Sequence, residues 1–213
     1  MLKTIFFDND GVLVDTEIHY FEATKTSLKE IGIELNLNEF INLFMVKNVG
    51  TIQKVTDAGF GVDVYNDVVK KRDIRYHNLL SQNNAILPNV YNVIKNLAQE
   101  YQLCIITSSL RKHFEVIHKQ TDLLPFFDII ICNEDVKKTK PDPEPYLKAL
   151  EKSGYAPEEA VVIEDSQRGL ISAQRAGIQS VAIPGHLNKN GDFTEATYKI
   201  DNILELPELL KKL

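Results

Sequence analysis

The feature that most constrains the fold is the segment Ile5-Phe6-Phe7-Asp8-Asn9-Asp10-Gly11, in which an apolar run ends at two carboxylates. A short continuous apolar run is typical of a central strand that is buried on both faces of a parallel sheet. Two acids at a buried strand end repel each other and lose hydration unless a cation or a proton joins them. Gly11 permits a sharp turn or the close approach of a ligand. We therefore predict a nucleophile and divalent-metal site at the carboxyl end of a parallel sheet, where open α/β folds bind ligands.

The composition restricts the class of protein. The chain has 213 residues and a net charge of -6, which argues against a nucleic-acid partner or an anionic membrane surface. Its apolar runs are shorter than the roughly 18 residues that span a bilayer, and the N-terminal residues do not resemble a signal peptide. Cys104 and Cys132 lie inside apolar runs, which predicts reduced, buried thiols. We expect a cytoplasmic monomer without nucleic-acid or membrane partners.

A long helical block separates the first predicted strand, residues 3–8, from the rest of the chain. Between residues 17 and 80 the apolar side chains recur at helical spacing. A crossover between parallel strands needs only about a dozen residues, so this block indicates an inserted subdomain. The predicted domains are a core of residues 1–15 and 86–213 and an all-α insert of residues 16–85.

Strands and helices alternate after Pro88, which predicts right-handed crossovers and a largely parallel sheet. The predicted strands cover residues 103–107, 128–132, 160–163, 180–183 and 198–200. The predicted helices cover residues 89–100, 110–120, 145–154 and 168–176, with a last helix from residue 206. The expected fold class is α/β, with a doubly wound, mainly parallel, Rossmann-like sheet and an inserted helical subdomain.

Two further strand ends carry polar residues, and in a parallel sheet they should converge with Asp8. Thr107-Ser108-Ser109 offers hydroxyls and amides before a helix, which suits an anion such as phosphate, although helix capping is the favoured explanation of this segment taken alone. Glu164 and Asp165 form a second acid pair, of which only one could cap the following helix. Metal ligation is the better explanation of Asp165, and Mg²⁺ prefers such oxygen ligands.

A fourth cluster contains a lysine beside a stiff loop. Lys140 precedes Pro141, Pro143 and Pro145, which restrict the backbone. Alone, such a lysine would be a solvated surface charge; beside several acids and a phosphate it would be the neutralising cation. The histidines show no metal-ligand spacing, and we expect them at the surface or the edge of the core: His19, His77, His113, His118 and His186.

These four clusters, in this order, resemble the haloacid dehalogenase-like hydrolases, in particular the branch of sugar-phosphate and phosphoglycolate phosphatases and β-phosphoglucomutase-like enzymes. The four matching segments are Asp8-Asn9-Asp10-Gly11-Val12-Leu13, Thr107-Ser108, Lys140-Pro141-Asp142-Pro143 and Val162–Gly169. The resemblance extends over nearly the whole chain and implies that the helical insert is a cap, which closes over the site and selects the leaving group. Each motif is weak alone, but four at these spacings are specific.

The resemblance implies a Mg²⁺-dependent phosphatase of small phosphorylated metabolites. Asp8 would attack phosphorus to give an aspartyl-phosphate, and Asp10 would act first as general acid and then as general base. The implied Mg²⁺ ligands are Asp8, the Asp10 carbonyl and Asp165, with Glu164 as a further ligand or a supporting residue. The implied phosphate-binding residues are Thr107, Ser108, Lys140 and the backbone at Asn9 and Gly11.

Departures from the family pattern leave alternatives open. Asn9 stands where this branch has an apolar or small residue, and Tyr20 stands where it often has a histidine. No cap arginine typical of mutases is evident near Lys47 and Asn48, so a phosphohexomutase is the alternative rather than the first choice. A receiver-like phospho-acceptor would place its paired acids and its acceptor on different strands and would lack the insert. A catalytically silent partner protein would not need the complete set of acids and lysine.

Overall fold

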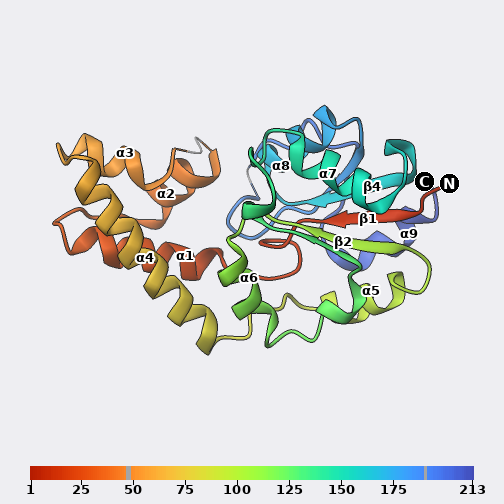
Figure 1. Cartoon of the computed structure of the whole chain (residues 1–213), viewed down its shortest axis with the longest axis horizontal. Coiled ribbons are helices and arrows are strands. Elements are labelled where there is room, and N and C mark those ends of the chain that lie inside the picture. The colour runs from red at the N-terminus through yellow and green to blue at the C-terminus, as the bar shows by residue number, and fades with distance from the viewer. Residues whose placement is uncertain (47–48, 190) are drawn as a thin grey trace. The chain divides into compact units, whose positions relative to one another are not determined.

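The chain forms two compact units. The computed structural model describes residues 1–46, 49–189 and 191–213 (Figure 1). Met1–Asp15 and Ala85–Leu213 make up the first unit, here called the core unit, and Thr16–Asn84 make up the second, here called the helical unit. The chain returns to the core unit one residue before the boundary predicted from the sequence. That the helical unit acts as a cap stays a prediction.

The core unit contains a six-stranded sheet in the order β3-β2-β1-β4-β5-β6, and the strands pair in parallel. The strands are β1 (Thr4–Phe7), β2 (Gln102–Ile106), β3 (Ile129–Ile131), β4 (Ala160–Glu164), β5 (Gln179–Ala182) and β6 (Tyr198–Lys199). The predicted doubly wound parallel sheet is confirmed.

The register of β1 decides which strand ends meet. Phe7 lies beside Ile105 of β2 on one side and Ile163 of β4 on the other. Pairing continues for one residue, because the Asp8 amide donates to the Ile163 carbonyl at 2.9 Å. The chain builds the sheet outwards from β1 in both directions, so the end of β1 is its topological switch point. Open α/β sheets bind ligands at such a point.

Helices cover both faces of the sheet, with α7 and α8 on one side and α5 and α9 on the other (Figure 1). They are α5 (Val90–Leu97), α6 (Arg111–His118), α7 (Glu144–Ser153), α8 (Gln167–Arg175) and α9 (Leu206–Leu210), with short 3-10 turns at Leu124–Phe126, Asn133–Asp135, Pro157–Glu159 and Ile203–Glu205. Alternate strand residues Phe6, Cys104 and Val162 pack with Tyr146 and Ala173 in one apolar cluster. Burial on both faces explains the apolar runs of the central strands β1, β2 and β4.

The segments that leave and re-enter the core unit pair with each other. The Asp15 amide donates to the Ala85 carbonyl at 2.7 Å, and the Leu87 amide donates to the Leu13 carbonyl at 3.0 Å. Val14 and Ile86 form an antiparallel bridge between these bonds. The core unit therefore brings the two ends of the inserted segment to one place.

The helical unit is built on its first and last helices, which pack against each other. Its elements are α1 (Glu17–Lys29), α2 (Leu37–Phe40), a π-helical segment (Ile41–Val46), α3 (Gly50–Asp57) and α4 (Val62–Gln82). Phe21, Leu28, Phe40 and Val68 belong to its apolar core. Lys47 and Asn48, which bear on the mutase alternative, lie outside the described residues. Within the described ranges, no helix is both long and apolar enough to cross a membrane.

Candidate active site

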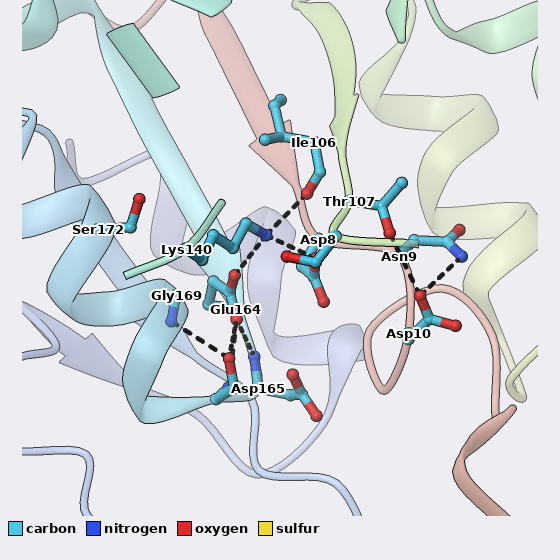
Figure 2. A network of polar contacts seen from close by, with 12 residues as sticks. Asp8, Asn9, Asp10, Ile106, Thr107, Lys140, Glu164, Asp165, Gly169 and Ser172 are labelled. Carbon is cyan, nitrogen blue, oxygen red and sulfur yellow. Dashed lines mark hydrogen bonds and ion pairs between the residues drawn. The ribbon is translucent and has the colours of Figure 1, made fainter. Parts of the chain in front are cut away.

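Lys140 lies at the centre of the candidate site, between two carboxylates (Figure 2). Its Nζ lies 2.6 Å from Asp8 Oδ1, 2.7 Å from Glu164 Oε1 and 2.7 Å from the Ile106 carbonyl oxygen. The side chain is buried, and Nζ also lies 5.1 Å from the centre of the Tyr146 ring. All three hydrogens of the ammonium group thus have acceptors, as a buried charge requires.

The loop that carries Lys140 is anchored to α8. Ser172 Oγ donates to the Asp142 carbonyl at 2.6 Å, and Arg175 Nη1 donates to the Pro141 carbonyl at 3.0 Å. These bonds act together with the prolines, which restrict the backbone. The stiff loop explains why a lysine that resembles a surface residue in the sequence enters the interior.

The charges of this cluster depend on one another. Burial raises the pKa of Asp8 to about 7, and Glu164 adds to the increase while Lys140 opposes it. Burial alone would also raise the pKa of Glu164, but Lys140, Ser166 and Tyr146 outweigh it and leave that pKa lowered. Burial alone would lower the pKa of Lys140, but Asp8 and Glu164 leave it raised. A further cation beside Asp8 would favour its charged form.

Glu164 is the last residue of β4, and hydrogen-bond donors surround its buried carboxylate. Oε1 accepts from Lys140 Nζ and, at 3.0 Å, from the Tyr146 hydroxyl. Oε2 accepts from the Ser166 hydroxyl at 2.9 Å and from the backbone amides of Asp165 and Ser166. Gly169 leaves room for this carboxyl, because a Cβ there would overlap it. These bonds favour Glu164 as a residue that positions Lys140; its predicted direct ligation of a metal stays a prediction.

Three acids form a potential cation site. Asp8, Glu164 and Asp165 each offer a carboxylate oxygen, and these oxygens lie within 4.8 Å of one another. Asp165 is buried, and its Oδ2 accepts from Asn188 Nδ2 at 2.9 Å. Gly11 has φ +84°, and a Cβ there would overlap the Asp165 carboxyl, so only glycine allows the loop after β1 so close to this acid. Clustered hard oxygen donors of this kind fit Mg²⁺.

Asp10 receives hydrogen bonds from the loop that follows β2. Ser109 Oγ donates to Asp10 Oδ2 at 2.8 Å, and Thr107 Oγ1 donates to the same oxygen at 3.3 Å. The Thr107 hydroxyl in turn accepts the Ser109 amide at 2.9 Å. The predicted hydroxyl cluster therefore meets the second acid of the first motif, and it fixes the orientation of that carboxyl.

Asn9 lies fully buried between the two acids of the first motif. Its side chain points away from Asp8 and towards α6, where its Oδ1 lies 2.7 Å from His118 Nε2. Its backbone carbonyl accepts amides of the following turn, including that of Leu13 at 2.9 Å. Asn9 thus stabilises the turn through its backbone and contacts a buried histidine through its side chain.

The structure brings most of the predicted residues together at one edge of the sheet. Asp8, Lys140, Glu164 and Asp165 form one group, and Asp10, Asn9 and Thr107 form a second, adjoining one. Gly11 approaches Asp165, and the Ser108 carbonyl accepts from Asn133 Nδ2 at 3.2 Å. Which of these residues bind phosphate or metal stays a prediction.

Four residues of the site are not among those predicted from the sequence to bind phosphate or metal: Ser109, His118, Tyr146 and Asn188. Ser109 is the third hydroxyl of the segment Thr107-Ser108-Ser109, so its position in the sequence is a sufficient signal. The expectation that the histidines lie at the surface or core edge is wrong for His113 and His118, which are buried. Tyr146 and Asn188 have no local sequence signal, because their partners lie 18 and 23 residues away.

Fold and site together define the class: a doubly wound α/β protein with a carboxylate–lysine centre at the switch point of its sheet. The model of the haloacid dehalogenase-like hydrolase family matches residues 5–183. The chain belongs to this family, and the resemblance seen in its motifs is confirmed.

Relatives of this chain carry the names of phosphatases. A pyrophosphatase PpaX from Oceanobacillus iheyensis is 28% identical over 85% of this chain and 83% of its own length. A phosphorylated carbohydrates phosphatase from Thermotoga maritima is 27% identical, with 84% of each chain covered.

Solved structures share the fold. A putative β-phosphoglucomutase from Thermotoga maritima is 26% identical, with a TM-score of 0.77 and full coverage of both chains. A putative phosphoglycolate phosphatase from Lactobacillus plantarum has a TM-score of 0.84 at 23% identity and covers 98% of this chain and 99% of its own.

Proposed function

We propose that this protein is a Mg²⁺-dependent phosphatase that hydrolyses a small phosphorylated metabolite through an aspartyl-phosphate intermediate. The observation that carries the proposal is the position of Asp8, a buried carboxylate held 2.6 Å from Lys140 Nζ and grouped with Asp165. Family membership as a hydrolase and relatives named as phosphatases support it.

In the first step Asp8 attacks phosphorus, a P–O bond forms to its carboxylate, and the bond to the leaving oxygen breaks. Asp10 gives its proton to that leaving oxygen as general acid. Lys140, together with hydroxyls and amides of the residue 107–109 loop, stabilises the negative charge of the phosphoryl oxygens. Carbon–halogen substitution needs no acid for its leaving group, so Asp10 favours phosphoryl transfer over dehalogenation.

In the second step Asp10, now a carboxylate, removes a proton from water as the water attacks the aspartyl-phosphate. Inorganic phosphate leaves, Asp8 is restored as a carboxylate, and Asp10 is protonated again. Mg²⁺, held by Asp8, Asp165 and the Asp10 carbonyl, would supply positive charge that offsets the repulsion between a carboxylate and a phosphate dianion. The chain's own residues thus account for nucleophile, acid and base.

The substrate is proposed only as a class. Sugar phosphates come first, because a relative is named a phosphorylated carbohydrates phosphatase, and phosphoglycolate and pyrophosphate follow from the names of others. The net charge of -6 suits neither nucleic acid nor an anionic membrane as a partner. A cytoplasmic location and a monomeric state remain part of this proposal.

The test measures phosphate released from p-nitrophenyl phosphate and from a panel of sugar phosphates, with Mg²⁺ and with EDTA. Asp8→Asn should lose more than a thousandfold of the activity, since positioned nucleophiles contribute on that order. Asp201→Asn makes the same chemical change at an exposed loop of the core unit and serves as the control. Full activity of Asp8→Asn would refute the assigned nucleophile. Glucose 6-phosphate as the main product from glucose 1-phosphate would favour the phosphohexomutase.

A further inference from the structure

A buried histidine that the proposed chemistry does not use lies behind the site. His118 is the last residue of α6 and is only 4% exposed. The centre of its ring lies 4.4 Å from the centre of the Phe114 ring. Its Nε2 lies 2.7 Å from Asn9 Oδ1, and its Nδ1 lies 2.8 Å from Thr121 Oγ1. Thr121 and Asn9 are buried as well, so water does not compete for these bonds.

Only one assignment of donors and acceptors is consistent with the contacts among His118, Asn9 and Thr121. Burial lowers the pKa of His118 to about 4, although the charge of Asp10 opposes this, so the ring is neutral near pH 7. An amide oxygen only accepts, so the single ring hydrogen must lie on Nε2 and be donated to Asn9. Nδ1 then accepts from the Thr121 hydroxyl. With its oxygen engaged, the Asn9 amide group turns its Nδ2 towards Asp10 Oδ2, at 3.4 Å.

We propose that His118 and Asn9 are positioning residues, which hold the carboxyl of Asp10 in the orientation that general acid–base catalysis requires. This inference rests on the phosphatase function proposed above. It also assigns a purpose to Asn9, the polar residue that departs from the apolar or small pattern between the two acids.

The arrangement around Asp10 explains what such positioning achieves. Oδ2 accepts from Ser109 at 2.8 Å, from Thr107 at 3.3 Å and from Asn9 at 3.4 Å. An oxygen that already accepts three hydrogen bonds is poorly suited to carry a proton, so the acidic proton is directed to Oδ1. During cleavage this proton moves from Oδ1 to the leaving oxygen while the P–O bond breaks. Misorientation would therefore matter most when the leaving group is strongly basic.

The test compares two aryl phosphates of similar size but different leaving groups. Phenyl phosphate releases a basic phenolate and depends on protonation, whereas p-nitrophenyl phosphate releases a stabilised anion. The measured quantity is the ratio of the two kcat/KM values, phenyl over p-nitrophenyl, for the full-length protein with Mg²⁺. In His118→Phe this ratio should fall about tenfold, a part of what a general acid contributes. In His118→Gln, whose side-chain amide can donate to Asn9, the ratio should stay within about twofold of the wild-type ratio.

A second variant separates positioning from packing. Asn9→Leu combined with His118→Phe replaces the polar pair by an apolar one, so neither partner is left buried and unpaired. Its ratio should remain low although its melting temperature returns towards the wild-type value. If His118→Phe alone does not fold, the ratio measured for this double variant tests the proposal in its place.

Three outcomes overturn the inference while leaving the phosphatase intact: an unchanged ratio in His118→Phe, an equal fall in His118→Gln, or a restored ratio in the apolar pair. A wild-type protein that releases phosphate from neither these esters nor the sugar phosphates overturns the proposed function, and the inference with it. The wild-type measurement thus distinguishes the two failures.

Discussion

Lys140 supplies the positive charge among the buried acids, so removing it should affect stability as well as activity. Lys140→Met would leave Asp8 and Glu164 buried without their cation. Breaking a buried ion pair by removing one partner costs about 3–5 kcal/mol. We expect urea unfolding to show a loss of that order and phosphate release to fall about a hundred- to a thousandfold, as on the loss of a charge-stabilising group.

Lys138 offers a matched control two residues earlier in the same loop. It is exposed, and its Nζ lies 3.6 Å from Asp142 in a surface ion pair. Lys138→Met should change the free energy of unfolding by less than about 0.5 kcal/mol, as surface substitutions usually do. Equal losses for the two methionine variants would contradict the role assigned to the buried lysine.

His118 should make stability depend on pH in a specific direction. Its pKa is about 6.5 in an unfolded chain and is lowered to about 4 by burial in the folded protein. The unfolded state therefore binds the proton first as the pH falls. The contribution of neutral His118 is complete above pH 6.5 and is lost between pH 6.5 and 4, up to about 3 kcal/mol. His118→Gln removes this titration, so wild type should lose stability relative to the variant on acidification, as measured by urea unfolding at pH 7 and 4.5. A difference that does not change with pH would contradict the prediction.

The sequence predicts those site residues that follow an apolar strand or precede a rigid turn. Asp8 and Asp165 could be predicted because an acid pair at the end of a buried apolar run does not contribute to stability by itself, and Lys140 because three prolines follow it closely. His118 and Tyr146 could not be, because each lies in an amphipathic helix and resembles an ordinary packing residue. Their hydrogen bonds are to partners that only the folded chain brings near, such as Asn9, 109 residues away from His118.

At the scale of elements, a substitution at Gly169 tests how closely α8 packs against the carboxyl of Glu164. Replacing a helical glycine by alanine normally stabilises by about 1 kcal/mol. A methyl group on Gly169 would overlap the Glu164 carboxyl, so Gly169→Ala should instead destabilise, since overpacking costs about 1–3 kcal/mol. Phosphate release should fall with it, because Glu164 holds Lys140. Gln174→Ala, at an exposed position of the same helix, is the control. A Gly169→Ala variant that is more stable than wild type would contradict the close packing of Gly169 against Glu164.

Elements with strong sequence signals form where they were predicted, within a few residues. The central strands β1, β2 and β4 are examples, because their residues are almost all buried. The division of the first helical stretch was not predicted. An Asn36–Glu39 capping box starts α2, which then continues as a π-helical segment from Ile41. The π-helical segment has only 6 residues, too few for its i→i+5 spacing to be distinguished from α-helical spacing in the sequence.

For the whole molecule, binding of Mg²⁺ should raise thermal stability, a readout that does not require a substrate. A ligand that binds only the folded state at a hundred times its Kd stabilises by about 2.7 kcal/mol. For a chain of this size each kcal/mol raises Tm by roughly 2–4 °C. MgCl₂ should therefore raise Tm by several degrees more than NaCl of equal ionic strength does, and EDTA should reverse the increase.

Asp165→Asn should abolish the difference between the two salts, because Asp165 belongs to the acid cluster that would hold the ion. Asp201→Asn should retain it, since this exposed residue lies outside the cluster. An equal effect of MgCl₂ on both variants would argue against the acid cluster as the metal site.

The paired segments around Val14 and Ile86 also have a consequence for how such a chain can change over evolution. Asp15 and Ala85 are hydrogen-bonded neighbours, so the sheet imposes no length or shape on the residues between them. Those residues could be exchanged, lengthened or replaced by a two-residue turn without altering the path of a single strand. A chain that joins Asp15 to Ala85 through Asn-Gly should accordingly unfold cooperatively on heating; a molten product would show that the core unit depends on its insert. The core unit should therefore accept inserts of different length and structure between Asp15 and Ala85.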